Sequence, residues 1–165
     1  MSLYLESFYT IRFGDCDPFR HLNNARYVDY FMNAREDHLK DNYNMDLSDY
    51  YKKGVGWVVL QHDINYLRPA NLNEKVCIRS GLLGVGPEHL LLEMLMLDEK
   101  QVQLKALMHT RFIPISLATG KREAHLPEFM EFITDKVIAG INEETVTVKE
   151  RISYWQQILK PVPNN

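Results

Sequence analysis

Residues 12–27 read RFGDCDPFRHLNNARY, and the interpretation of the whole chain begins from this stretch. It starts in a polar loop with two carboxylates, Asp15 and Asp17, and it ends near two asparagines, Asn23 and Asn24. An asparagine before a helix is a good N-cap, because its side-chain oxygen can accept a hydrogen bond from a free amide of the first turn. The stretch therefore predicts a polar loop that leads directly into a helix.

Beyond this loop the sequence takes on a helical period. Side chains recur at steps of three and four residues, which predicts a helix of about five turns over residues 24–42. The Asn/Asp-rich stretch at residues 41–44 predicts its end. The recurring residues are Val28, Phe31, Met32, Arg35 and Leu39.

The remaining periodicity is mostly that of strands joined by short connections, which favours antiparallel pairing. Residues 89–97 are apolar at nearly every position, as expected of a central strand covered on both faces. One early helix followed by a run of strands predicts an α+β fold with the sheet wrapped on the helix. The predicted strands are residues 3–13, 56–66, 74–83, 89–97 and 102–112.

Two more helices are predicted near the C-terminus. Pro127 suits the first position of a helix, because its missing amide is not needed there. A second helical face is predicted within residues 148–159. We expect a main domain over residues 1–140 and a helical extension over residues 141–165. The apolar residues that define the two faces are Phe129, Phe132, Ile133 and Val137, and then Ile152, Trp155 and Leu159.

Composition narrows the class of protein. The chain of 165 residues carries 19 Lys+Arg and 22 Asp+Glu, a balance that argues against a nucleic-acid or anionic-membrane partner. Its two cysteines make neither a disulfide framework nor a four-ligand metal set. The start of the chain lacks the basic region of a signal peptide, and no apolar run approaches the ~20 residues that span a bilayer. We therefore expect a cytoplasmic protein.

The stretch 12–27 resembles the signature of the 4-hydroxybenzoyl-CoA thioesterase family of hot-dog proteins. Its GDCDP part, residues 14–18, is similar to the aryl-CoA enzyme, whereas its HLNNARY part, residues 21–27, is closer to the branch that acts on long-chain acyl-CoA and acyl-carrier-protein thioesters. Weaker matches follow in the family's order, and the resemblance covers about residues 3–138. These weaker matches are Ala34-Arg35, Tyr66 to Ala70, Thr119 to Lys121 and Leu126-Pro127.

The resemblance implies a hot-dog fold, in which a five-stranded antiparallel sheet wraps a long central helix. It also implies that two subunits pair their sheets with the active sites between them, so that the protein is a homodimer or homotetramer. An isolated subunit would leave a sheet edge open, which is consistent with such pairing.

The resemblance also implies roles for particular residues. Thioester hydrolysis needs an activated water or a protein nucleophile, and it needs stabilisation of the oxyanion. Asp17 is expected to be the general base or the nucleophile, although an Asp before Pro can also simply start a turn. The helix amides near Asn24 are expected to polarise the carbonyl, and Asn24 itself is expected to cap the helix and to shape the site, with its side chain holding the substrate or water. His21 is expected to orient or protonate, or else only to pack, and Tyr27 and Arg68 are expected to bind substrate.

Several alternatives remain open from the sequence. The substrate is an acyl-CoA or an acyl-carrier-protein thioester, and its acyl group is aryl, short or long. The pair Asp17 and His21 also resembles the pair used by enoyl-CoA hydratases of the same fold, and a non-catalytic acyl-binding module is a further possibility. No cofactor is expected beyond the CoA of the substrate. No metal is expected either, because the strand histidines lack ligand spacing. Asp15 is expected to be a loop residue and Cys16 to be inert.

Overall fold

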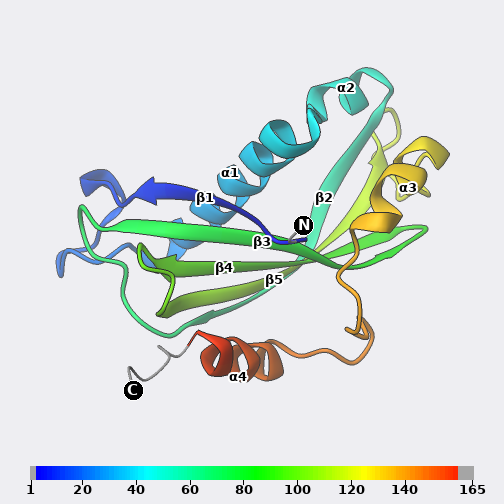
Figure 1. Ribbon diagram of the computed structural model, residues 1–165. Coiled ribbons are helices and arrows are strands. Elements are labelled where there is room, and N and C mark those ends of the chain that lie inside the picture. The colour runs from blue at the N-terminus through cyan, green and yellow to red at the C-terminus, as the bar shows by residue number, and fades with distance from the viewer. Residues whose placement is uncertain (1–2, 160–165) are drawn as a thin grey trace.

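Helix α1 (Asn24–Tyr43) lies across one face of a five-stranded antiparallel sheet in the computed structural model, which describes residues 3–159 (Figure 1). The strand order is β1-β3-β4-β5-β2, and every neighbouring pair is antiparallel. This arrangement confirms the predicted α+β hot-dog architecture. The strands are β1 (Leu5–Thr10), β2 (Val55–Tyr66), β3 (Lys75–Gly86), β4 (His89–Asp98) and β5 (Leu104–Ser116).

The main core lies between α1 and the inner face of the sheet. One stripe of α1, which includes the fully buried Phe31 and Ala34, packs against apolar side chains of the sheet. The helix ends at Tyr43, within the predicted stretch, and its C-cap Asn44 has a φ of 50°, a left-handed conformation that asparagine tolerates. The side chains that the sheet contributes to this core include Ile78, Met94, Met96, Ala106 and Met108.

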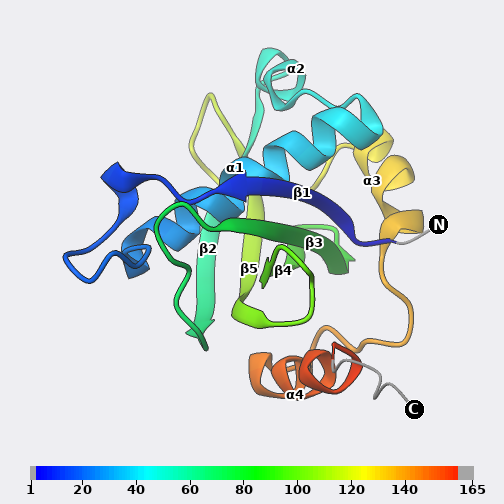
Figure 2. The ribbon, with the colours of Figure 1, turned by 60° about the vertical axis from the view of Figure 1, so that its left-hand side comes forward.

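A second apolar cluster covers the opposite, outer face of the sheet. Figure 2 shows α4 (Val148–Ile158) on the side of the sheet away from α1. Since β4 contributes Met94 and Met96 to the inner core and Leu95 and Leu97 to the outer cluster, it is covered on both faces as predicted. The buried members of the outer cluster are Cys77, Leu95, Leu97, Leu104, Leu107, Val148 and Trp155.

Some element boundaries differ from the predictions. The first strand ends at Thr10, and a 3-10 turn (Phe13–Asp15) follows it. The last strand begins at Leu104 instead of residue 102, because the Asp98 carboxylate accepts hydrogen bonds from the amides of Val102 and Gln103 and holds them in the turn. Local hydrogen bonding by a short polar side chain thus competes with strand pairing here.

The helical connections also differ. A short helix, α2 (Leu47–Lys52), was not predicted, because six residues are too few to show a helical period. Helix α3 (Pro127–Ile133) begins at Pro127 as predicted, but a 3-10 turn (Thr134–Lys136) follows it. Val137 therefore leaves the predicted helical stripe and forms a parallel bridge with Leu82. The division of the chain at residue 140 stays a prediction.

A buried carboxylate joins α4 to the sheet. Glu93 of β4 is fully buried, and its oxygens accept hydrogen bonds from Trp155 at 2.7 Å, from Tyr4 at 2.7 Å and from Arg151 at 2.8 and 3.0 Å. His109 lies 3.1 Å from the same carboxylate. Every partner is a donor toward one ionised group, so the network is complete only while Glu93 carries its charge.

Burial by itself would raise the pKa of Glu93, but the hydrogen bonds from His109, Arg151 and Tyr4 outweigh it and lower the pKa to about 2. In the unfolded chain a glutamate titrates at about pH 4.3. The stabilisation that ionised Glu93 provides is therefore fully present above that pH, and it is lost as the pH falls toward 2.

We expect Glu93→Gln to lower the free energy of unfolding by about 3 kcal/mol at pH 7, because it leaves the buried Arg151 guanidinium without a counter-charge. Urea denaturation would measure the free energy of unfolding of both proteins. The difference between Glu93→Gln and wild type should shrink as the pH falls below about 4. Glu144→Gln removes an exposed carboxylate and should cost less than about 0.5 kcal/mol. A gap between Glu93→Gln and wild type that does not change with pH would contradict this account.

Candidate active site

The loop between β1 and α1 closes on itself through backbone hydrogen bonds. Cys16 and Leu22 form an isolated antiparallel bridge, and the Asp17 amide donates to the His21 carbonyl at 2.8 Å. Arg20 has a φ of 65°, and its amide donates to the Asp17 carbonyl at 3.0 Å. The chain therefore reverses tightly just before the helix, which returns Asp17 toward the helix start.

The Asp17 carboxylate uses its two oxygens differently. Its Oδ1 accepts from the amides of Phe19 at 2.9 Å and His21 at 3.1 Å, which is the turn-forming role that an Asp before Pro can play. Its Oδ2 has no hydrogen-bond partner within residues 3–159. One oxygen thus fixes the orientation of the side chain, and the other is available to a ligand.

The first turn of α1 leaves one amide unused. The Asn23 side chain caps the helix by accepting from the Ala25 amide at 3.0 Å, and the Asn23 carbonyl accepts from the Arg26 amide at 2.8 Å. Asn23 is therefore the N-cap, and Asn24 is the first residue of the helix. The Asn24 amide has no acceptor in the described part of the chain, as expected of a first-turn donor. It points a hydrogen-bond donor out of the positive end of the helix dipole.

Asp17 and Asn24 line the same surface pocket of about 240 Å³. The end of β2 forms its other side, and the Tyr66 hydroxyl donates to the Asn24 carbonyl at 2.9 Å, which ties that strand to the helix start. The structure thus brings together four of the five predicted site residues. The pocket is lined by Asp17, His21, Leu22, Asn24, Tyr66, Leu67, Arg68 and Pro69.

The fifth predicted residue, Tyr27, lies in the core and not in the lining of this pocket. Its ring is buried, and it packs edge-on against Tyr66 with the ring centroids 5.0 Å apart. Its hydroxyl accepts from the Ala70 amide at 3.2 Å. Tyr27 therefore supports Tyr66, which does line the pocket.

The side chains of Asp15 and Cys16, which precede Asp17 in the loop, form hydrogen bonds with other residues. The Asp15 carboxylate accepts from the Tyr30 hydroxyl at 2.8 Å, and the Cys16 thiol donates to the Arg12 carbonyl at 3.2 Å. Burial and the two adjacent carboxylates raise the pKa of Cys16. Because only the thiolate is a strong nucleophile, this environment disfavours nucleophilic chemistry at Cys16.

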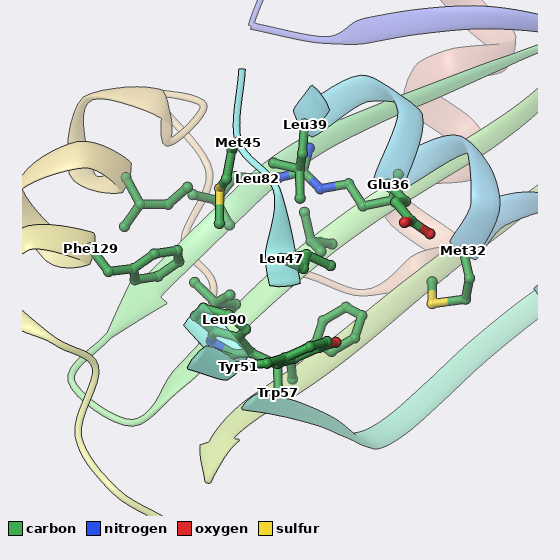
Figure 3. A pocket seen from close by; sticks show the side chains of 14 residues that line it. Met32, Glu36, Leu39, Met45, Leu47, Tyr51, Trp57, Leu82, Leu90 and Phe129 are labelled. Atoms are coloured by element: carbon green, nitrogen blue, oxygen red, sulfur yellow. The ribbon is translucent and has the colours of Figure 1, made fainter. Parts of the chain in front are cut away.

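A second, largely apolar cavity of about 230 Å³ lies further along α1, enclosed by the sheet, α2 and α3 (Figure 3). This cavity could not be predicted from the sequence, because α2 is too short to show a helical period. The helical period nevertheless indicated part of its lining, since three of the recurring residues, Met32, Arg35 and Leu39, line the cavity. The remaining lining residues are Glu36, Met45, Leu47, Tyr51, Trp57, Leu82, Leu90, Leu92, Phe112, Phe129 and Ile133.

Two other kinds of site are absent from residues 3–159. No group of three or more His, Cys, Asp or Glu side chains is arranged to hold a metal ion. No helix in this range combines the length and the apolar character needed to cross a membrane.

Comparison with known families now defines the class of protein. Residues 11–154 match the model of the thioesterase-like superfamily, which is most of the chain. The chain therefore belongs to that superfamily.

Two proteins from Escherichia coli are similar to this chain in sequence or in structure. The long-chain acyl-CoA thioesterase FadM of Escherichia coli (strain K12) is 30% identical over 121 residues, which are 73% of this chain and 90% of that protein. The crystal structure of YbaW, a probable thioesterase from Escherichia coli, has a TM-score of 0.70 at 29% identity and covers 81% of this chain and 99% of that one.

More distant structures show the fold alone. A DHNA-CoA thioesterase from Staphylococcus aureus has a TM-score of 0.72 at 18% identity, and the match covers 96% of this chain and 97% of that one. A putative oleoyl thioesterase from Lactobacillus plantarum has a TM-score of 0.72 at 23% identity over 78% of this chain. This chain spans only 49% of the length of that second protein.

Proposed function

We propose that this protein is an acyl-CoA thioesterase, which hydrolyses a thioester to a free acid and CoA. The observation that carries the proposal is that Asp17 and Asn24 line one pocket, while a carboxylate oxygen of Asp17 and the amide of Asn24 have no partner in residues 3–159. The named activities of FadM and of the other relatives support it.

In this mechanism the carbonyl oxygen of the thioester binds at the Asn24 amide. That donor and the helix dipole stabilise the negative charge that develops on the oxygen. Asp17 either removes a proton from an attacking water or attacks the carbonyl itself to form an anhydride that water then hydrolyses. Both routes break the carbon–sulfur bond, place the oxygen of water in the acid and release CoA as the thiol.

Two further residues of the pocket have proposed roles. The His21 ring has no hydrogen-bond partner among residues 3–159, so it is available to orient the substrate or to protonate the leaving sulfur. The exposed Arg68 lines the same pocket and forms no ion pair within residues 3–159, which supports a role in contacting a CoA phosphate.

The apolar cavity along α1 favours a long acyl chain. Its aromatic and aliphatic lining suits an alkyl group, and the relative FadM is named for long-chain substrates. The aryl substrate implied by the resemblance of residues 14–18 to the 4-hydroxybenzoyl-CoA family is the alternative within the same reaction.

We also propose that the protein works as a homodimer, or as a homotetramer built from such dimers. Strand β2 is an open edge of the sheet and exposes Val58, Val59 and Leu60, of which Leu60 is 55% accessible. An exposed, apolar edge strand invites pairing with another chain. Since Tyr66 at the end of β2 lines the pocket, a partner paired there would lie beside the site.

We expect Asp17→Asn to lower turnover by about a hundredfold or more, because it removes the charge that activates water or attacks the thioester. An asparagine oxygen can still accept from the Phe19 and His21 amides, so the loop and the free energy of unfolding should change little. Thiol release from aryl, short-chain and long-chain acyl-CoAs would measure the effect and identify the acyl group.

The matched control is Asp15→Asn, which changes the other carboxylate of the loop and should retain most of the activity. Full activity in folded Asp17→Asn would overturn the assignment. No thiol release from any acyl-CoA would contradict the proposal and would direct the assay to carrier-protein thioesters. A 3-hydroxyacyl-CoA product would indicate a hydratase, and binding without turnover would indicate an acyl-binding module.

We expect light scattering to show that the wild-type protein is at least a dimer. Leu60→Lys should shift the dimer–monomer equilibrium toward the monomer, because it places a charge on the β2 edge. Ile158→Lys adds the same charge at an exposed residue of α4, so it should leave the dimer intact. A wild-type monomer with full activity would contradict the proposed pairing.

A further inference from the structure

Arg35 is an unusual member of the apolar cavity along α1. It is half-buried, yet no carboxylate within residues 3–159 forms an ion pair with it. Its one hydrogen bond runs from Nη1 to the Ser80 hydroxyl at 3.3 Å. A charged group in such surroundings is costly to desolvate unless it gains a partner.

Most of the Arg35 donors remain available. A guanidinium carries five N–H donors in a planar fork, and the bond to Ser80 uses one of them. No side-chain nitrogen or oxygen sealed from solvent lacks a hydrogen-bond partner in the described part of the chain. The unused nitrogens of Arg35 therefore have access to the cavity or to the solvent that enters it.

The group stays charged at neutral pH. Burial lowers the pKa of Arg35, but only to about 10. The buried His38 lies 2.7 Å from the same Ser80 hydroxyl, and desolvation together with the charge of Arg35 lowers the pKa of His38 to about 4. His38 is thus neutral and supplies no counter-charge to Arg35.

Two other polar groups line the cavity, the carboxylate of Glu36 and the hydroxyl of Tyr51 (Figure 3). Glu36 is exposed and, in the described range, forms no ion pair with Arg35. The cavity therefore combines an apolar wall with a cation, Arg35, most of whose donors have no acceptor in the described part of the chain.

The distance along α1 suits the far end of an acyl chain. Arg35 follows Asn24 by 11 residues, which is about 16 Å along the helix. An extended chain of roughly a dozen carbons covers that distance, given carbon–carbon bonds of about 1.5 Å. Two half-buried apolar residues, Val28 and Met32, lie on α1 between Asn24 and Arg35.

We propose that Arg35 is a specificity residue that selects acyl chains with a carboxylate at the end distal to the thioester. The inference rests on the proposed thioesterase function, because it assumes that the acyl chain runs from the Asn24 amide into the cavity. The guanidinium fork would then bind the distal carboxylate by two parallel hydrogen bonds, while the apolar wall binds the methylenes between.

The test compares two acyl-CoAs of about twelve carbons, one with a terminal carboxylate and one with a terminal methyl. We expect wild type to have the higher kcat/KM for the carboxylate form. Arg35→Met should reduce that preference by about ten- to a hundredfold, as expected for loss of a charge-assisted hydrogen bond. Its kcat/KM for the methyl form should stay within a few-fold of wild type.

Two further variants separate recognition from folding. Arg35→Lys keeps the charge but not the fork, so it should retain only part of the preference. Glu36→Gln removes the other charge of the cavity and should retain or increase the preference. Equal loss of activity on both substrates in Arg35→Met, or no preference in wild type, would overturn the inference.

A binding measurement keeps this inference separate from the proposed function. Calorimetry of the free dicarboxylic and monocarboxylic acids of the same length requires no turnover. If neither thioester is cleaved, the thioesterase proposal fails, and the calorimetry decides about Arg35. Tighter binding of the dicarboxylic acid by wild type, lost in Arg35→Met, would support the inference, and equal binding would overturn it.

Discussion

The site depends on one constraint, which is that the first turn of a helix has amides with no intrahelical acceptor. In this protein the Asn23 side chain and carbonyl satisfy two of those amides, and the Asn24 amide remains. Because Phe31 and Ala34 anchor α1 in the core, this donor is held by a rigid element. A donor fixed in advance can stabilise developing charge without the cost of reorganisation.

The loop before the helix shows how one residue can serve both structure and chemistry. Oδ1 of Asp17 closes the turn, and this contact orients the Oδ2 that is free to react. The turn-forming role of Asp17 and its proposed catalytic role are therefore compatible. Asp15 is two residues away, but its bond to Tyr30 ties it to α1 and leaves Asp17 as the free carboxylate of the loop.

Much of this arrangement could be predicted from the sequence. The helix over residues 24–42 had a clear period and an asparagine cap, and the apolar run at 89–97 identified the central strand. What could not be predicted came from one short helix and from contacts distant in sequence. Helix α2 is too short to have a period, and the Val137 bridge to Leu82 replaced an extension of α3. The cavity beside Arg35 is built from seven separate parts of the chain, so no local pattern could reveal it.

A buried ion pair attaches helix α4 to the outer face of the sheet. Glu93 on the central strand binds Arg151 and Trp155 of α4, so the C-terminal helix is attached by buried charge as well as by apolar contact. With α1 on one face of the sheet and α4 on the other, β2 is the longer of the two edge strands among residues 3–159.

The most direct test of the central claim is a crystal structure with an acyl-CoA analogue in which a methylene group replaces the thioester sulfur. We predict that the ketone oxygen lies within about 3 Å of the Asn24 amide, and that an Asp17 oxygen, or a water bound to it, lies about 3–3.5 Å from the carbonyl carbon. A ketone bound away from both groups would contradict the account.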